Sequence, residues 1–366
     1  MEVADVSSPS TEQPLFTTLI PTFRRPVLLR RAILSALAQT ERRLVVKVFD
    51  NASGDDTREV VQRLAEADPR VRYHCHDENI GIIANFNYAL QSVDTTFFSL
   101  LSDDDVLLPK FYQSALRGFA DHPDAGLWAG TVVFTDVEGS YAVPGPVLAP
   151  YAHWTPPESI VAWRHNTRPL VPAQVLRREV VEAVGGIRPM GSASPGMLSD
   201  FDFEMQVTGR FPVVITDTRV ALVTEHAGAA TRTVEHDAGF WWEAYTIIAE
   251  RLRASPHLEP KVVDRVLRAL REDLAETMFR IGSLAVTSGN MSHGRSLAAA
   301  LRSKFDEPRR ASVIERSAAI AQKLPGAQGA LAAFRVGRAR IKRASLHRKN
   351  LALRRYLECP TADFAL

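Results

Sequence analysis

Cysteine and long apolar runs are scarce in this sequence. Its 366 residues include only two cysteines, Cys75 and Cys359. They lie far apart and show neither metal-ligand spacing nor a disulfide framework, which favours a reducing, cytoplasmic location. No run of about 18 apolar residues is present, so no membrane-spanning helix is expected. Met1–Gln13 is polar and acidic, whereas a secretory signal begins basic and turns apolar, so we expect a flexible leader over residues 1–14.

The chain as a whole has a net charge of only +2, but its charged residues are unevenly distributed along the sequence. Between Ala333 and Tyr356 there are nine Lys and Arg residues and no acidic residue, so this segment carries +9 and the remainder −7. Two interpretations stay open for the basic tail, residues 333–366. It is an interfacial helix on anionic lipid at the inner face of the membrane, or a solvated helix against the acidic body or a second subunit. Aromatic residues for base stacking are sparse there, so no nucleic-acid partner is expected.

Strand patterns alternate with helix patterns in the N-terminal part of the chain. Leu15–Ile20, Leu44–Phe49 and Val71–Cys75 are short apolar runs, and Pro26–Thr40 carries apolar residues at helical spacing. Strands that alternate with helices through short loops form βαβ units and a mostly parallel sheet. The sequence therefore predicts an α/β fold.

One apolar run ends at three adjacent carboxylates. Thr95–Leu101 predicts a buried strand, and Asp103–Asp105 follows after one serine. In an open α/β sheet, ligands bind beyond the carboxyl ends of the strands, and adjacent like charges favour a bound cation. Mg²⁺ and Mn²⁺ prefer carboxylate oxygens and leave positions open for phosphates, so one hypothesis is a metal-diphosphate site. The alternative is a solvated acidic turn that caps the helix beginning near Pro109.

Polar residues follow each of the predicted strands. They are Thr22, the pair Asp50–Asn51, Asn79, and the stretch Asp103–Asp105. Because the carboxyl ends of parallel strands share one edge of a sheet, we expect the four clusters to converge there. This convergence favours the ligand site over the capping turn.

Two features follow in the middle of the chain. Val143–Pro172 is rich in proline and aromatic residues, and a long irregular segment of this kind is either an acceptor lid or a wrapping of the core. Further on, helical spacing over Leu198–Met205 places Asp200 and Glu204 on one face. The opposite face carries apolar residues, which indicates where that helix packs.

The remaining pattern is simpler. Phe211–Thr216 and Arg219–Thr224 predict two strands, and His226 lies at the tip of the second. From Phe240 onward the pattern is helical without a site-like cluster, which suits scaffolding, dimerisation or partner contact. We therefore divide the chain into an α/β domain over residues 15–235, a helical region over 236–332, and the basic tail.

The order of these motifs resembles that of the family 2 inverting glycosyltransferases of the GT-A fold, over roughly Leu15–Thr231. Such a fold has a Rossmann-like, mostly parallel mixed sheet flanked by helices, here with a helical C-terminal region. Two positions depart from the family pattern. Ser102 is the first position of the DxD region, and Ser199 stands where an acid before the catalytic base is usual. The matching stretches are Thr18–Arg25, Val48–Thr57, Glu78–Asn85, Ser102–Asp105, Gly185–Gly186 and Ser199–Asp202.

The resemblance implies a role for each matching residue. Asp200 is the expected catalytic base, with Asp202 and Glu204 as alternative bases or as a solvated helix face. Asp104 is the expected principal ligand of Mn²⁺ or Mg²⁺, helped by Asp105. His226 is expected to contact the metal or the diphosphate, or to be purely structural. The donor is expected to contact Pro21, Thr22, Phe23, Arg25, Asp50, Asn51, Asn79, Gly81, Asn85 and Asp103.

The implied reaction moves a sugar from a nucleotide diphosphate, UDP- or dTDP-linked by default, to an acceptor hydroxyl or amine with inversion. Two rival functions stay open. A nucleotidyltransferase on a related sheet would normally carry a glycine-rich phosphate loop after its first strand, where Pro21–Phe23 has no glycine. The second rival is a non-catalytic nucleotide-sugar-binding protein, against which the intact carboxylates argue. A test of donor hydrolysis with Mn²⁺ distinguishes it from an enzyme.

Overall fold

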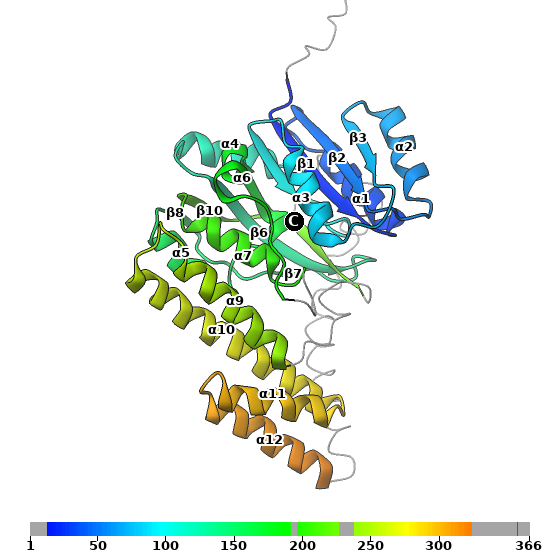
Figure 1. Ribbon diagram of the computed structural model, residues 1–366. Helices are drawn as coiled ribbons and strands as arrows, with labels where there is room; N and C mark the ends of the chain where they lie inside the picture. The colour runs from blue at the N-terminus through cyan, green and yellow to red at the C-terminus, as the bar shows by residue number, and fades with distance from the viewer. Residues whose placement is uncertain (1–12, 192–195, 227–237, 324–356, 358–366) are drawn as a thin grey trace, which may run out of the picture.

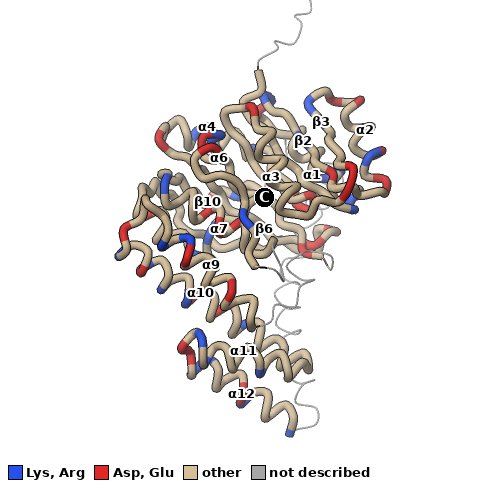
Figure 2. Tube along the Cα trace, in the orientation of Figure 1, with Lys and Arg blue, Asp and Glu red and all other residues tan. Residues whose placement is uncertain are grey.

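The computed structural model describes residues 13–191, 196–226, 238–323 and 357 (Figure 1). The basic tail, apart from Leu357, and residues 1–12 of the leader lie outside these ranges, so what we expect of both segments stays a prediction. Figure 2 shows acidic and basic residues interspersed along the described trace. Within that part of the chain, no helix is both long enough and apolar enough to cross a membrane.

The described residues form one ten-stranded sheet in the order β3-β2-β1-β4-β9-β6-β10-β5, with β7 beside β6 and β8 beside β10. Its first four strands are parallel, because β1 pairs with both β2 and β4, and β2 with β3. Every residue of β1 is buried, as expected for a parallel strand covered on both faces. The elements of this half are β1 (Phe16–Thr22), α1 (Pro26–Leu37), β2 (Leu44–Asp50), α2 (Thr57–Ala67), β3 (Val71–Cys75), α3 (Ile82–Gln91) and β4 (Phe97–Leu100).

The second half of the sheet is mixed. β9 runs antiparallel to both β4 and β6, whereas β6 and β10 are parallel to each other. The carboxyl ends of β6 and β10 therefore reach the same edge as those of β1 to β4. The elements are β5 (Val106–Leu107), α4 (Phe111–Asp121), β6 (Leu127–Asp136), β7 (Val143–Pro144), β8 (Tyr151–Trp154), α5 (Glu158–Ala162), a 3-10 turn (Val171–Ala173), β9 (Gln174–Arg177), α6 (Arg178–Val184), α7 (Ser199–Thr208) and β10 (Val213–Glu225).

The prediction of two strands after α7 is wrong, since β10 is a single strand. Its register against β6 shifts between Ile215 and Arg219 and again between Arg219 and Ala221. Residues 217–219 are exposed at this irregularity, so their polar side chains imitate a turn in the sequence. The short strand β5, which the sequence does not indicate, pairs with β10 just beyond it.

Alternate residues of each strand enter two separate cores. Leu19 and Val213 face one core, whereas their neighbours Ile20 and Val214 face the other. Helices α1 and α4 cover the second core. The first core is covered by α3, α7 and the C-terminal helices.

The C-terminal region is helical, as predicted. Figure 1 shows α9 and α10 along one end of the sheet and α11 and α12 extending beyond it. Arg164, just after α5, donates 3.1 Å and 2.5 Å hydrogen bonds to Asp273 of α10, which fixes this helix to the α/β domain. The helices are α9 (Ala238–Arg253), α10 (Pro260–Thr287), α11 (Met291–Ser303) and α12 (Pro308–Lys323).

Candidate active site

The tips of three adjacent strands bring predicted donor-binding residues together. Thr22 at the end of β1 lies in register with Asp50 at the end of β2, and β4 on the other side of β1 leads to Asp103. Thr22 Oγ1 donates a 2.7 Å hydrogen bond to Asp103 Oδ2. These clusters share one edge, which confirms the convergence expected from parallel strands.

Asp103 and Asp104 share one guanidinium group. Arg25, immediately before α1, donates from Nη1 to Asp103 Oδ1 at 3.0 Å and to Asp104 Oδ2 at 2.8 Å. Burial raises the pKa of Asp103, and the positive charge of Arg25 opposes that shift. Two carboxylates on one guanidinium nitrogen keep an excess of negative charge at the sheet edge, which attracts a further cation.

Asp105 turns toward β10. Its side chain is buried, and its Oδ1 accepts a 3.0 Å hydrogen bond from the backbone N–H of Thr224. Burial raises the pKa of Asp105 well above its usual value. The capping alternative for the acidic turn is wrong, because α4 begins after Lys110 and receives no side-chain cap.

His226 follows β10 and reaches Asp104, with 2.9 Å between Nε2 and Oδ2. Two neighbouring ligands of an octahedral ion, each at about 2.1 Å, lie about 3 Å apart. The spacing of the pair therefore also suits Mn²⁺ or Mg²⁺, for which the Asp104 oxygen is the preferred type of ligand, with phosphate oxygens in other positions. Among the described residues, only one group has three candidate ligand atoms within 4.8 Å of one another, and that group contains neither Asp104 nor His226. Asp105 is thus not a third close ligand in this arrangement.

Asp50 is held by a compact set of donors. Its Oδ1 accepts hydrogen bonds from the backbone N–H and the hydroxyl of Ser53, at 2.9 Å and 2.6 Å. Its Oδ2 accepts a 2.6 Å bond from the Tyr73 hydroxyl. Burial and this bond raise the pKa of Tyr73, which keeps the hydroxyl a donor. The carboxylate is therefore fixed in orientation before any ligand arrives.

Asn51 and Asn79 join the tip of β2 to the start of α3. Asn51 Nδ2 donates to Asn79 Oδ1 at 3.0 Å, and Asn51 Oδ1 accepts from the Ile80 N–H at 2.9 Å. Gly81 precedes α3 with φ of +85°, a conformation that a side chain would strain, and its N–H bonds to Asn79 Oδ1. The turn is thus preorganised by its own side chains.

Three other predicted donor contacts differ in exposure. Pro21 is buried within β1. Asn85 is also buried, and its Nδ2 donates a 3.0 Å hydrogen bond to the carbonyl of Phe49, so it braces α3 against β2. Phe23 is 38% exposed, and the guanidinium of Arg24 lies 4.9 Å from its ring centre.

Asp200 lies in the first turn of α7. Its Oδ2 accepts a 2.7 Å hydrogen bond from Arg168 Nη2, and its side chain is 39% exposed. Ser199, at the position where the resemblance leads one to expect an acid, is buried and donates to the Gly196 carbonyl. Asp200 is therefore held in place by a cation while remaining accessible.

Glu204 shares Arg168 with Asp200, as their common helical face requires. Arg168 Nε donates to Glu204 Oε2 at 2.6 Å, and Trp163 and Gln174 supply further hydrogen bonds. Burial raises the pKa of Glu204 to about 7, although Arg168 and both hydrogen bonds favour the charged form. Glu204 is 1% exposed, so the expectation of a solvated face is wrong for it.

The same expectation is wrong for Asp202, which is 0% exposed. Its Oδ2 accepts hydrogen bonds from Arg188 at 2.9 Å and from Arg251 of α9 at 2.7 Å. Asp202 is thus enclosed between the α6–α7 segment and the C-terminal helices. Its position suits an anchor for α9 and not a base.

One cavity of about 620 Å³ is lined by residues from the tip of β4 and from α7. Ser102 and Asp105 line it from the tip of β4, and Asp200 lines it from α7. Arg168 from the proline-rich segment and Arg280 from α10 also contribute. The proline-rich segment therefore lines the cavity, and its Trp163 is buried in the core.

Sequence reasoning missed three residues of the site. Arg168 lies in a segment of mixed composition with no motif around it. It is identified only by the structure, which buries its guanidinium beside Asp200 and Glu204. Arg280 lies in a helix whose sequence shows no cluster. Tyr73 could have been found, because it stands in the strand next to Asp50 with side chains on alternate faces.

Comparison with known proteins places this geometry in a class. Residues 17–185 match the model of the family described as Glycosyl transferase family 2. In structure, the chain is similar to S. aureus TarS in complex with UDP-GlcNAc, with a TM-score of 0.58, 15% identity, and coverage of 88% of this chain and 92% of that one. The fold is therefore GT-A.

Curated relatives agree with that class. A Campylobacter jejuni GalNAc(5)-diNAcBac-PP-undecaprenol beta-1,3-glucosyltransferase is 37% identical over 29% of this chain and 36% of its own length. The Myxococcus xanthus O-antigen biosynthesis protein RfbC is 24% identical over 82% of this chain and 25% of its own. The matches thus span about a third or less of these relatives. Residues 17–185 are therefore similar to family 2 glycosyltransferases, and the described residues have the GT-A fold, as the motifs predict.

Proposed function

We propose that this protein is a metal-dependent inverting glycosyltransferase that uses a nucleotide-diphosphate sugar, with Asp200 as general base. The observation that carries the proposal is the single cavity with Ser102 and Asp105 on one wall and Asp200 on another. An in-line attack needs the leaving group and the base on opposite sides of one sugar. The family match supports the transferase class, and the UDP-GlcNAc bound by TarS supports a UDP-linked donor before a dTDP-linked one.

On the donor side, Asp104 and His226 would hold Mn²⁺ or Mg²⁺. Such an ion, when bound, neutralises charge that builds on the departing diphosphate. Arg25 keeps Asp103 and Asp104 aimed at the sheet edge, and its positive charge favours the ionised form of Asp103. Thr22 fixes the second oxygen of Asp103, which leaves this carboxylate oriented for a ribose hydroxyl.

On the base side, Asp200 would accept the proton of the attacking hydroxyl or amine. Arg168 fixes the orientation of the carboxylate through one oxygen. The same guanidinium also bonds to Glu204, so Arg168 is shared between the two carboxylates. General-base catalysis of this kind contributes about 10²–10⁴ in rate.

The first experiment is a thermal-shift screen of the full chain with nucleoside diphosphates, with and without Mn²⁺. A ligand that binds the native state raises the melting temperature. We expect UDP to raise it, to do so more strongly with Mn²⁺, and EDTA to reverse that gain. The variant Asp104→Asn should lose the Mn²⁺-dependent part, whereas Asp217→Asn, in the exposed part of β10, should keep it. Equal shifts in all three proteins would contradict the metal site.

The second experiment separates the rival functions by their products. A glycosyltransferase releases a nucleoside diphosphate from a sugar nucleotide, whereas a nucleotidyltransferase releases pyrophosphate from a nucleoside triphosphate. Incubation with UDP-sugars and Mn²⁺ should yield UDP. Pyrophosphate release from triphosphates would favour the nucleotidyltransferase. Binding without release of UDP, even with a range of acceptor sugars, would favour a non-catalytic binding protein.

A further inference from the structure

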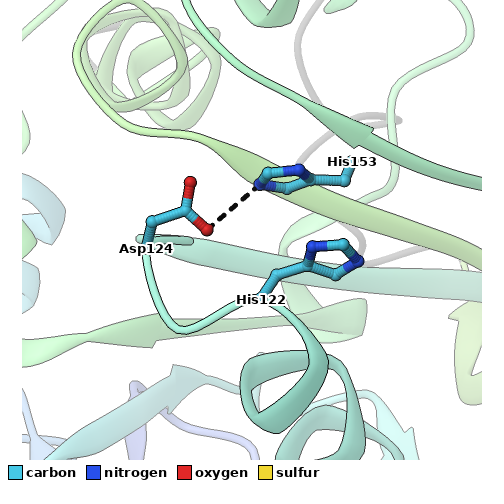
Figure 3. A group of neighbouring side chains, drawn as sticks. All are labelled: His122, Asp124 and His153. Atoms are coloured by element: carbon cyan, nitrogen blue, oxygen red, sulfur yellow. Dashed lines mark ion pairs between the residues drawn. The ribbon is translucent and has the colours of Figure 1, made fainter.

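A second group of metal-binding side chains lies at the opposite edge of the sheet. His122 and Asp124 come from the turn between α4 and β6, and His153 comes from β8. Their candidate ligand atoms all lie within 4.8 Å of one another, and Figure 3 shows the two imidazole rings one above the other, with the Asp124 carboxylate beside His153. The turn precedes β6, and β8 pairs with the first residues of β10. The group is thus at the amino ends of strands whose carboxyl ends carry the active site.

One atom of this group has a single protein contact. His153 Nε2 is buried and lies 3.2 Å from Asp124 Oδ1, within ion-pair distance, but it makes no hydrogen bond to any described residue. A buried polar atom without a hydrogen bond is unfavourable and usually marks a missing water or ion. A cation between this nitrogen and the Asp124 carboxylate would replace their direct contact with two metal–ligand bonds.

The other histidine already has the support that a metal ligand needs. His122 Nε2 lies 2.7 Å from the Tyr151 hydroxyl, which leaves Nδ1 on the side of His153 and Asp124. Ligating histidines generally donate their second ring N–H to such an oxygen, which fixes tautomer and ring orientation. The two imidazole rings stack with centres 4.1 Å apart and planes 17° from parallel, so one ring must turn before both can face a common ion.

We propose that His122, Asp124 and His153 bind a divalent transition-metal ion, Zn²⁺ above all, in a site separate from the donor site. Two imidazoles and one carboxylate suit Zn²⁺, whereas Mg²⁺ prefers oxygen ligands alone. Tetrahedral Zn²⁺ with bonds of about 2.0–2.1 Å needs ligand atoms about 3.3 Å apart. The ligand atoms of the three side chains must therefore move closer together when the ion binds. Asp124 is 54% exposed and has room to rotate toward the two rings.

The ion would join β8 to the turn before β6. β8 precedes Trp163 and Arg168 within the proline-rich segment. The bound ion would therefore hold this segment at a point far from the cavity. A ligand bound by the native state alone stabilises it in proportion to its occupancy. The role is therefore structural, and it holds whether or not the proposed transferase activity does.

The test uses untagged full-length protein that has been stripped with EDTA and dialysed against Zn²⁺ alone. We expect one equivalent of Zn²⁺ to remain after gel filtration, and Co²⁺ in its place to give the absorption of a tetrahedral site. His153→Gln and Asp124→Asn should each lower Zn²⁺ affinity by at least about tenfold, and Tyr151→Phe by about 10–100-fold. The exposed His257→Gln should match wild type.

Two comparisons keep the outcome decisive. Asp104→Asn should retain the Zn²⁺ and the Co²⁺ spectrum, because the donor site is separate. Should His153→Gln fail to fold, the exposed Asp124→Asn gives the same test. The proposal is overturned if wild type retains no more Zn²⁺ than Asp124→Asn, or if the bound ion disappears with Asp104→Asn.

Discussion

The two halves of the active site treat their carboxylates in opposite ways. At the donor side, Asp103 and Asp104 meet the same nitrogen of Arg25, with His226 beside the second of them. On α7, by contrast, Asp202 is enclosed by two arginines and is fully buried. On the donor side acidic side chains therefore outnumber the cations that contact them, whereas on α7 each acidic side chain is matched by an arginine.

This difference indicates which groups are available for chemistry. A cluster short of positive charge attracts a cation, so the donor side is suited to hold a metal and the phosphates that come with it. A carboxylate enclosed by arginines is committed to holding the fold together. On α7 both Asp200 and Glu204 line the cavity, but the side chain of Asp200 is 39% exposed and that of Glu204 is 2% exposed, so Asp200 is the more accessible of the two.

The largest expected effect comes from Asp200→Asn. If Asp200 is the base, its loss should lower the rate of sugar transfer by about 10²–10⁴-fold while the UDP-induced thermal shift stays unchanged. Initial rates of UDP release in the presence of acceptor measure this. Asp217→Asn is the matched control and should keep wild-type rates. Normal turnover by Asp200→Asn would remove the contrast between the two halves.

Arg168→Met tests, through the free energy of unfolding, whether Arg168 balances the charges of Asp200 and Glu204 on α7. Removing the guanidinium leaves Glu204 buried beside Asp200 without a cation, which should lower the free energy of unfolding by about 3–5 kcal/mol. Urea denaturation measures it. Arg178→Met is the control, since Arg178 is 52% exposed and its pair with Glu182 is worth at most about 0.5 kcal/mol. Equal losses in both variants would show that Arg168 does not balance buried charge.

A smaller effect should appear in the pH dependence of stability. The pKa of Glu204 rises from 4.5 to about 7 in the folded protein, so the native state holds a proton that the unfolded chain releases. Stability from this group is fully present below about pH 4.5 and is lost as pH rises toward 7, on the order of 1–3 kcal/mol. Glu204→Gln should lack this loss. Parallel curves of unfolding free energy against pH for the two proteins would contradict it.

The smallest effect is expected on the donor side. Tyr73→Phe removes one hydrogen bond to Asp50, which keeps two donors from Ser53, so the free energy of unfolding should fall by about 1 kcal/mol. The exposed Tyr88→Phe serves as control and should change little. A loss as large as that of Arg168→Met would mean that Asp50 depends on one donor, as Asp200 and Glu204 depend on Arg168.

Local pattern was enough to predict that the polar tips of the parallel strands converge. Each of these strands is followed by its own turn, and parallel pairing of β1 with β2 and β4 makes the turns neighbours. Thr22, Asp50 and Asp103 could therefore be grouped before their contacts were known. The same reasoning identified α7 and its face with Asp200 and Glu204.

The sequence by itself determined the α/β class, the order of the strands' polar tips and the position of Asp200, because these depend on spacing within one element or between adjacent ones. Only the tertiary structure decided that β10 is continuous, that Asp202 and Glu204 are buried, and that Arg168 holds Asp200. Those outcomes depend on which distant segments cover a helix or strand. The charge that a buried acid requires is supplied by residues far away in the chain, and no local pattern records it.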